Sequence, residues 1–132
     1  EIIIQYPNAA DRSQFYSWFI WYEALAAAHA NDHPRAISNL RLLLDRATRA
    51  EQKGGGAGLV FSQANHYRYT LACMLDMGGE TTEAISLLKE ALTNDVGLYP
   101  AHVRLAEIYE RQRRTNASLA ERRRAVAPAN SR

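Results

Sequence analysis

Two histidines are the first residues of this chain whose spacing could do chemistry. His29 and His33 are four residues apart, the spacing at which two imidazoles on one helical face bind a metal ion. A turn sequence and Pro34 interrupt that face, and neither a cysteine nor a third ligand is near in the sequence. We therefore expect no metal site.

The single cysteine, Cys73, could act as a nucleophile if a base lay beside it. His66 precedes it by seven residues, which is two helical turns, so a Cys–His pair is conceivable. Nothing in the sequence orients that histidine or supplies an oxyanion hole. Between Ala72 and Met74, the cysteine is more typical of a small packed residue. We expect no catalytic residue, no cofactor and no enzymatic activity.

A glycine-rich run over residues 54–58 (GGGAG) raises the possibility of a phosphate-binding loop. Such a loop ends in Gly-Lys-Ser or Gly-Lys-Thr and lies within a βαβ unit, and the chain has neither feature. We interpret the run as a flexible break between helices.

Arginines gather near the C-terminal end. Residues 111–132 hold seven Arg and one Glu, whereas the whole chain has a net charge of only +2. The cluster could contact nucleic-acid phosphates or an acidic partner. No aromatic residues are interleaved for base stacking, so we favour a solvated last helix with Glu121–Arg124 facing water, and nucleic-acid binding is unlikely.

The elements that carry these residues are helices. Alanine is abundant, and apolar residues recur at spacings of three and four. No run of 18 apolar residues could span a membrane. We expect an all-α chain with an extended segment or linker over 1–12, a tail over 128–132, and helices at about 13–30, 34–52, 63–77, 82–94, 99–113 and 116–127, with Ser13 as the first N-cap.

The sequence repeats itself at an offset of 34 residues. Large residues fall on large ones and small on small: Leu71 on Leu105, Ala72 on Ala106, Ile85 on Leu119, Ala91 on Ala125 and Leu92 on Val126. Such a pattern is typical of helix pairs that close their cores only by stacking.

These residues resemble the tetratricopeptide repeat family, whose motif has 34 residues. The matching residues are Leu71-Ala72, Gly79-Glu80, Glu83-Ala84-Ile85, Lys89–Leu92, Leu105-Ala106, Tyr109 and Ala125-Val126. The third pair departs from the family's Gly-Asp turn at Arg113-Arg114, and Glu23 stands where a buried leucine is expected. The resemblance implies a TPR-like α-α superhelix over 13–127, with antiparallel pairs at about 13–52, 63–94 and 99–127 and a 14-residue insertion after the first pair.

The resemblance also implies a concave groove lined by the first helix of each pair. Such a groove binds a peptide or protein, so the chain would be an interaction scaffold. The positions carried over are Trp18, Trp21, His66, Tyr69, Cys73, Asp76, Met77, Val103, Arg104, Glu107, Glu110 and Arg111.

An aromatic run over Phe15–Tyr22 leaves a second function open. Its rings could form a binding platform, or they could fill the core and cap the stack, which we favour because cores take most large apolar side chains. Together with Ile2–Ile4 they make the N-terminal end apolar. The alternative is therefore an assembly module whose end is covered by a second copy, by more of a longer chain, or by Ile2–Ile4. A cytoplasmic location is slightly favoured.

Overall fold

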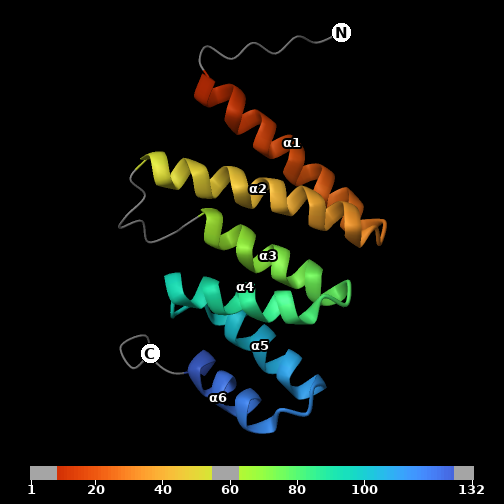
Figure 1. Ribbon diagram of the computed structural model, residues 1–132, viewed down its shortest axis with the longest axis vertical. Helices are drawn as coiled ribbons and strands as arrows, with labels where there is room; N and C mark the ends of the chain where they lie inside the picture. Colours follow the sequence, from red (N-terminus) through yellow and green to blue (C-terminus); the bar gives the residue numbers. More distant parts are fainter. Residues whose placement is uncertain (1–8, 55–62, 127–132) are drawn as a thin grey trace.

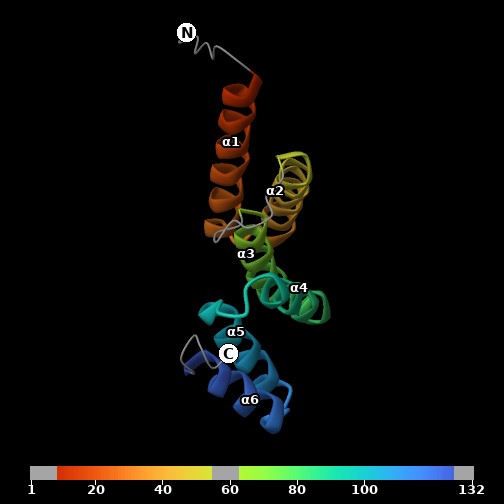
Figure 2. The ribbon, with the colours of Figure 1, turned by 90° about the vertical axis from the view of Figure 1, so that its left-hand side faces the viewer.

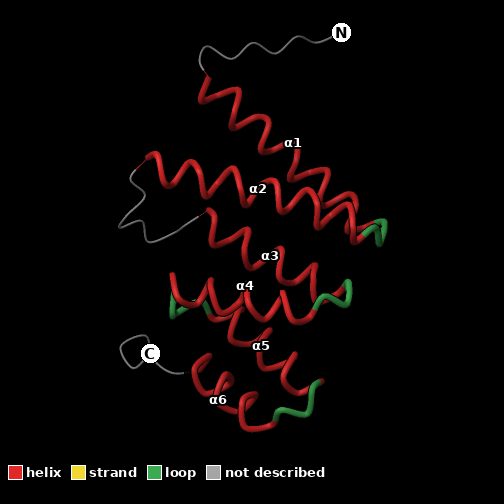
Figure 3. Tube along the Cα trace, viewed as in Figure 1, coloured by secondary structure: helices red, strands yellow, loops and turns green. Residues whose placement is uncertain are grey.

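Every regular element in the described part of the chain is a helix. The computed structural model describes residues 9–54 and 63–126 of the 132, and no strand occurs among them (Figure 1, Figure 3). The all-α prediction is confirmed. The helices are α1 (Ala9–His29), α2 (His33–Gly54), α3 (Gln63–Met77), α4 (Thr81–Asn94), α5 (Tyr99–Arg111) and α6 (Thr115–Val126).

The first helix begins earlier than the sequence predicted. We expected residues 1–12 to be extended and Ser13 to be the N-cap, but α1 is already helical at Ala9. Ala9 and Ala10 are the strongest helix formers, which accounts for the four additional residues. At the far end α2 continues to Gly54, and the rest of the predicted glycine-rich break lies outside the described residues.

The helices stack in chain order. Helix α1 packs against α2, α2 against α3, and so on to α6, and short turns join the two helices of each hairpin. Figure 1 shows α1 and α6 at opposite ends of the long axis, and Figure 2 shows α2 and α4 together on one side of the stack. The core therefore forms by contact between neighbours in the sequence.

The turns inside the three hairpins have the same geometry. Asn31, Gly79 and Arg113 have positive φ angles of 58°, 88° and 58°, and they are separated by 48 and then 34 residues. This is the left-handed residue that ends a helix in a Schellman motif, with its six-to-one hydrogen bond. The bonds run from the N–H groups of Asp32, Glu80 and Arg114 to the carbonyls of Ala27, Leu75 and Tyr109, at 2.8, 2.8 and 2.7 Å.

Burial repeats at the same offsets. Ala24, Ala72 and Ala106 are 3%, 0% and 0% exposed. In the second helices Ala36, Ala84 and Ser118 are likewise buried. Small side chains at these points let the helix backbones approach closely. The repeat register expected from the sequence, including that of the first pair, therefore agrees with the burial.

The position of Glu23 explains why the first pair departs from the sequence pattern. Its counterparts Leu71 and Leu105 are 1% and 0% exposed, because a helix of the preceding pair covers them. Helix α1 has no preceding helix among the described residues, so Glu23 stays partly exposed and pairs with Arg35 at 3.6 Å. At the other end Arg122 occupies the position of the buried Leu88, and it is exposed.

Candidate binding face

One buried carboxylate joins the first helices of the second and third hairpins. The side chain of Asp76, at the end of α3, is 1% exposed. Arg111 of α5 donates to both of its oxygens, Nη1 lying 3.1 Å from Oδ2 and Nη2 contacting Oδ1. Thr81 donates its hydroxyl at 3.4 Å, and Nη1 of Arg104 lies 3.9 Å away. Three of the positions assigned to the groove thus meet in one charged cluster.

Arg104 links this cluster to an aromatic side chain. Burial and the nearby Cys73 sulfur raise the pKa of Tyr69 above its ordinary value, and Arg104 acts in the opposite direction. Burial lowers the pKa of Arg104, but Cys73, Tyr69 and Glu107 raise it further, so its net shift is upward. Its guanidinium therefore stays charged. Both of its ion pairs are long, at 3.9 Å to Asp76 and 3.8 Å to Glu107, which leaves donors for a further acceptor.

Helix α1 extends the same face. The Trp21 ring lies 5.6 Å from the His66 ring and 5.9 Å from the Tyr67 ring, measured between centroids. These tilted aromatic contacts connect α1 to α3. His66 is exposed, so its imidazole is accessible beside the tryptophan.

The remaining groove positions differ in where they lie. Val103 is partly buried on α5, whereas Met77 and Glu107 are exposed. Glu110 points to α6 instead: its carboxylate accepts from Ser118 at 3.2 Å and from Arg122 at 2.9 Å. The bond from Arg122 holds the pKa of Glu110 below its ordinary value. Glu110 is therefore not part of the face that the α3 and α5 residues form.

The aromatic run on α1 does not fill the core. Among its members only Ile20 is buried, and Trp21 is partly buried. The expectation that most of these rings are packed inside is wrong, because the buried face of α1 consists of Ile20, Ala24 and Ala27. The rings that point outward are 44–65% exposed: Phe15, Tyr16, Trp18, Phe19 and Tyr22.

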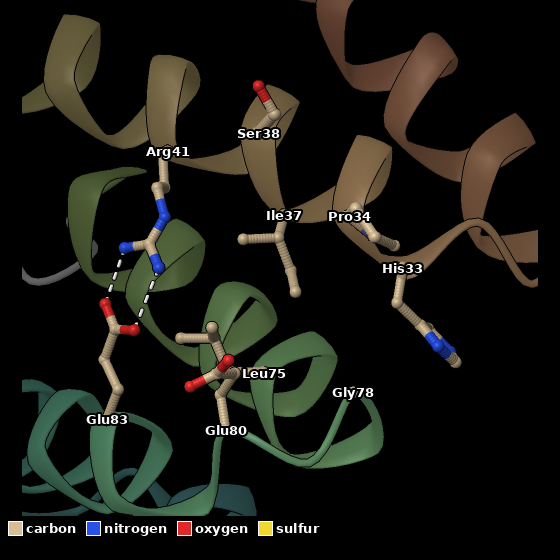
Figure 4. A pocket seen from close by; sticks show the side chains of 9 residues that line it. All are labelled: His33, Pro34, Ile37, Ser38, Arg41, Leu75, Gly78, Glu80 and Glu83. Carbon is tan, nitrogen blue, oxygen red and sulfur yellow. Dashed lines mark hydrogen bonds and ion pairs between the residues drawn. The ribbon is translucent and has the colours of Figure 1, made fainter.

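A pocket of about 490 Å³ lies on another part of the molecule, between α2, the end of α3 and the start of α4. Arg41 and Glu83 close one side of it through hydrogen bonds of 2.5 and 2.9 Å (Figure 4). The His33 ring points away from this pair, and its buried Nε2 has no hydrogen-bond partner among the described residues. Because Arg41 and Glu83 neutralise each other, the pocket offers no free cation to hold an anion.

Sequence reasoning missed a buried polar pair between α5 and α6. Nε2 of His102 donates to the carbonyl of Val96 at 2.9 Å, since a carbonyl can only accept, and Nδ1 lies 2.6 Å from the Glu121 carboxylate. Arg124 donates to the other carboxylate oxygen at 2.7 Å. Glu121 was expected to face water but is 7% exposed. The signal was present in the repeat, because His102 occupies the position of the buried Ile20.

The arginines of the last helix are partly engaged. Arg122 and Arg124 pair with Glu110 and Glu121, and the Arg114 guanidinium lies 4.4 Å from the Tyr109 ring centroid. Within the described residues, no group of three or more His, Cys, Asp or Glu side chains is placed to hold a metal ion. None of the helices there is long and apolar enough to cross a bilayer.

Comparison with known proteins returned no family model, no curated protein and no solved structure that matches the chain.

Proposed function

We propose that this chain is a TPR-like helical-repeat scaffold that binds a peptide or protein segment, without catalysing a reaction. The observation that carries the proposal is that side chains from α1, α3 and α5 contact one another on one face, through Trp21–His66 and through Asp76 with Arg104 and Arg111. Contact between the first helices of successive hairpins is what a continuous binding face requires. The repeated left-handed turn and the matching burial of alanines support the TPR-like arrangement.

The chemistry of this face suits an extended peptide. Trp21, His66 and Tyr69 offer rings, which dominate the binding energy at many interfaces. Arg104, with 28% of its side chain exposed and only long ion pairs, offers a guanidinium to a backbone carbonyl or a carboxylate. Asp76 holds two arginines in place and is itself too buried to be a contact residue.

Selection of random phage-displayed peptides on the full chain tests the proposal. The affinity of a selected peptide is then measured for His66→Ala and Arg104→Met. The controls are Ser86→Ala and Lys89→Met, which make comparable changes at exposed positions of α4. We expect each face variant to weaken binding by about tenfold, or about 1.4 kcal/mol, and each control to leave it unchanged.

Circular dichroism shows whether each variant keeps its helices. A library that yields no binder, or peptides that bind the two face variants as tightly as wild type, contradicts the proposal. Peptides that lose affinity with Lys89→Met instead would place the binding site on the opposite layer.

A further inference from the structure

We propose that the outer stripe of α1 is a homodimer interface in which α1 packs antiparallel against α1 of a second copy. The outer stripe consists of Phe15, Trp18, Phe19, Tyr22 and Leu25, which are 44%, 60%, 53%, 65% and 38% exposed. Their spacings of three and four residues place them along one face of the helix. That face is opposite the buried Ile20, Ala24 and Ala27, so it points away from α2.

The stripe is large enough to hold a dimer together. An aromatic side chain buries about 150–250 Å² when fully covered, so these half-exposed rings and Leu25 present roughly 500 Å². Two copies would bury about 1,000 Å² in total, near the lower limit for a specific interface. A single exposed apolar patch of this size is at the upper end of what monomers carry. Covering it therefore gives a dimer of micromolar strength.

The distribution of side-chain size along α1 selects the antiparallel arrangement. The outward residues of the N-terminal half are bulky, including Phe15 and Phe19, whereas Ala26 and Ala30 are small and exposed in the C-terminal half. A two-fold axis perpendicular to the helix places the bulky half of one copy against the small half of the other, which fills space well. A parallel pair would place rings on rings and alanines on alanines.

Charge also favours a second copy over other occupants. Among residues 15–28 of α1 the only charged side chain is Glu23, at the edge of the stripe, where it is paired with Arg35 at 3.6 Å. Two identical uncharged stripes meet without repulsion. A membrane surface would instead select lysines and arginines beside the apolar face, which this part of the helix does not have.

The dimer is independent of the proposed peptide-binding function. Its determinants, Phe19 and Tyr22, make no contact that the Asp76 cluster needs, and His66 and Arg104 are not in the stripe. Loss of peptide binding and loss of the dimer can therefore be measured separately.

Sedimentation velocity of the full chain over the micromolar range tests the interface. We expect wild type to form a dimer and nothing larger. Phe19→Glu and Tyr22→Glu should raise the dissociation constant by at least about a hundredfold, because each places two charges in an apolar contact. The matched control is Leu119→Glu, which changes a 48% exposed residue on α6 at the opposite end of the stack and should leave the dimer intact.

Three results would overturn the proposal. Wild type could stay monomeric at the highest concentration, the Phe19→Glu and Tyr22→Glu variants could dimerise as tightly as wild type, or Leu119→Glu could abolish the association. The last result, or growth beyond a dimer, would indicate head-to-tail stacking of α1 on α6 of the next copy. All three variants change exposed side chains, so they should retain the helical circular dichroism spectrum.

Cysteine cross-linking tests the direction of the pair. In an antiparallel dimer only residues near the axis meet their own copy closely enough for a disulfide, which needs Cα atoms within about 7 Å. Phe19→Cys should therefore cross-link under mild oxidation and Ala30→Cys should not. Wild type is the control for the buried Cys73. Cross-linking of both variants would show a parallel pair and refute the antiparallel arrangement, and cross-linking of neither would refute the interface.

Discussion

The two partners of the Asp76–Arg111 ion pair should contribute unequally to stability. The Asp76 side chain is 1% exposed, whereas the Arg111 side chain is 55% exposed. Arg111→Met keeps the aliphatic stem but leaves a buried carboxylate without its main partner. Asp76→Asn keeps the shape of the buried group and leaves a guanidinium that water can reach.

The expected magnitudes follow from this difference in burial. Breaking a buried pair so that one charge stays buried costs about 3–5 kcal/mol. Arg104 at 3.9 Å and Thr81 at 3.4 Å can partly replace the lost donors, so we expect about 3 kcal/mol for Arg111→Met. Asp76→Asn exchanges charged for neutral hydrogen bonds and should cost only about 1 kcal/mol.

Urea unfolding of the two variants and of wild type measures this difference. The slope with denaturant should stay constant, so that the midpoint alone reports stability. The double variant Arg104→Met/Arg111→Met should be less stable than Arg111→Met, because it removes the compensating cation. If Asp76→Asn costs as much as Arg111→Met or more, the assignment of the buried carboxylate as the constrained partner is wrong.

Three further predictions follow from the turns, the core and the surface charges. Arg113→Gly should stabilise the fold by about 0.5–1 kcal/mol, because its φ of 58° strains a side-chain residue but not glycine; a melting temperature no higher than that of wild type would refute this. Ala72→Leu should cost about 1–3 kcal/mol by overpacking a position that is 0% exposed, whereas Ser86→Leu on the surface of α4 should cost much less; equal melting temperatures for wild type and Ala72→Leu would count against the repeat register. The hydrogen bond from Arg41, opposed by burial, lowers the pKa of Glu83, so this pair stabilises the fold above the ordinary carboxyl range and the contribution is lost as pH falls through the lowered pKa. Both side chains are more than a third exposed, so Arg41→Met should cost well under about 1 kcal/mol at neutral pH and low salt, and the difference should vanish in acid; a difference that persists at pH 3 would contradict the assignment.

Helical periodicity was sufficient to predict most of the architecture. The apolar spacing and the 34-residue repeat gave the element type and nearly all helix boundaries, because the same alanines that set the repeat are buried in each hairpin. The N-terminal boundary was missed, since Ser13 looked like a cap although Ala9 and Ala10 already favour a helix. Periodicity reports which face of a helix is apolar, and for α1 the apolar face is wider than the buried one.

The side-chain pairings were less accessible to sequence reasoning. Asp76, Arg104 and Arg111 were each placed on the groove by analogy, yet nothing in their spacing shows that one carboxylate binds two arginines of another helix. Glu121 looked solvated because it precedes three arginines. Its burial depends on His102, which is 19 residues away in the sequence and is brought near only by the turn at Arg113.

The strictly sequential packing of the helices has a mechanical consequence. Each helix packs mainly against its neighbours in the chain, and α1 and α6 lie at opposite ends of the long axis (Figure 1). A pulling force applied to the two ends would act along the stack, with no contact between distant parts of the chain to share the load. Hairpins should then detach one after another from whichever end is weaker, and the molecule would lengthen in steps and shorten again when the tension is released.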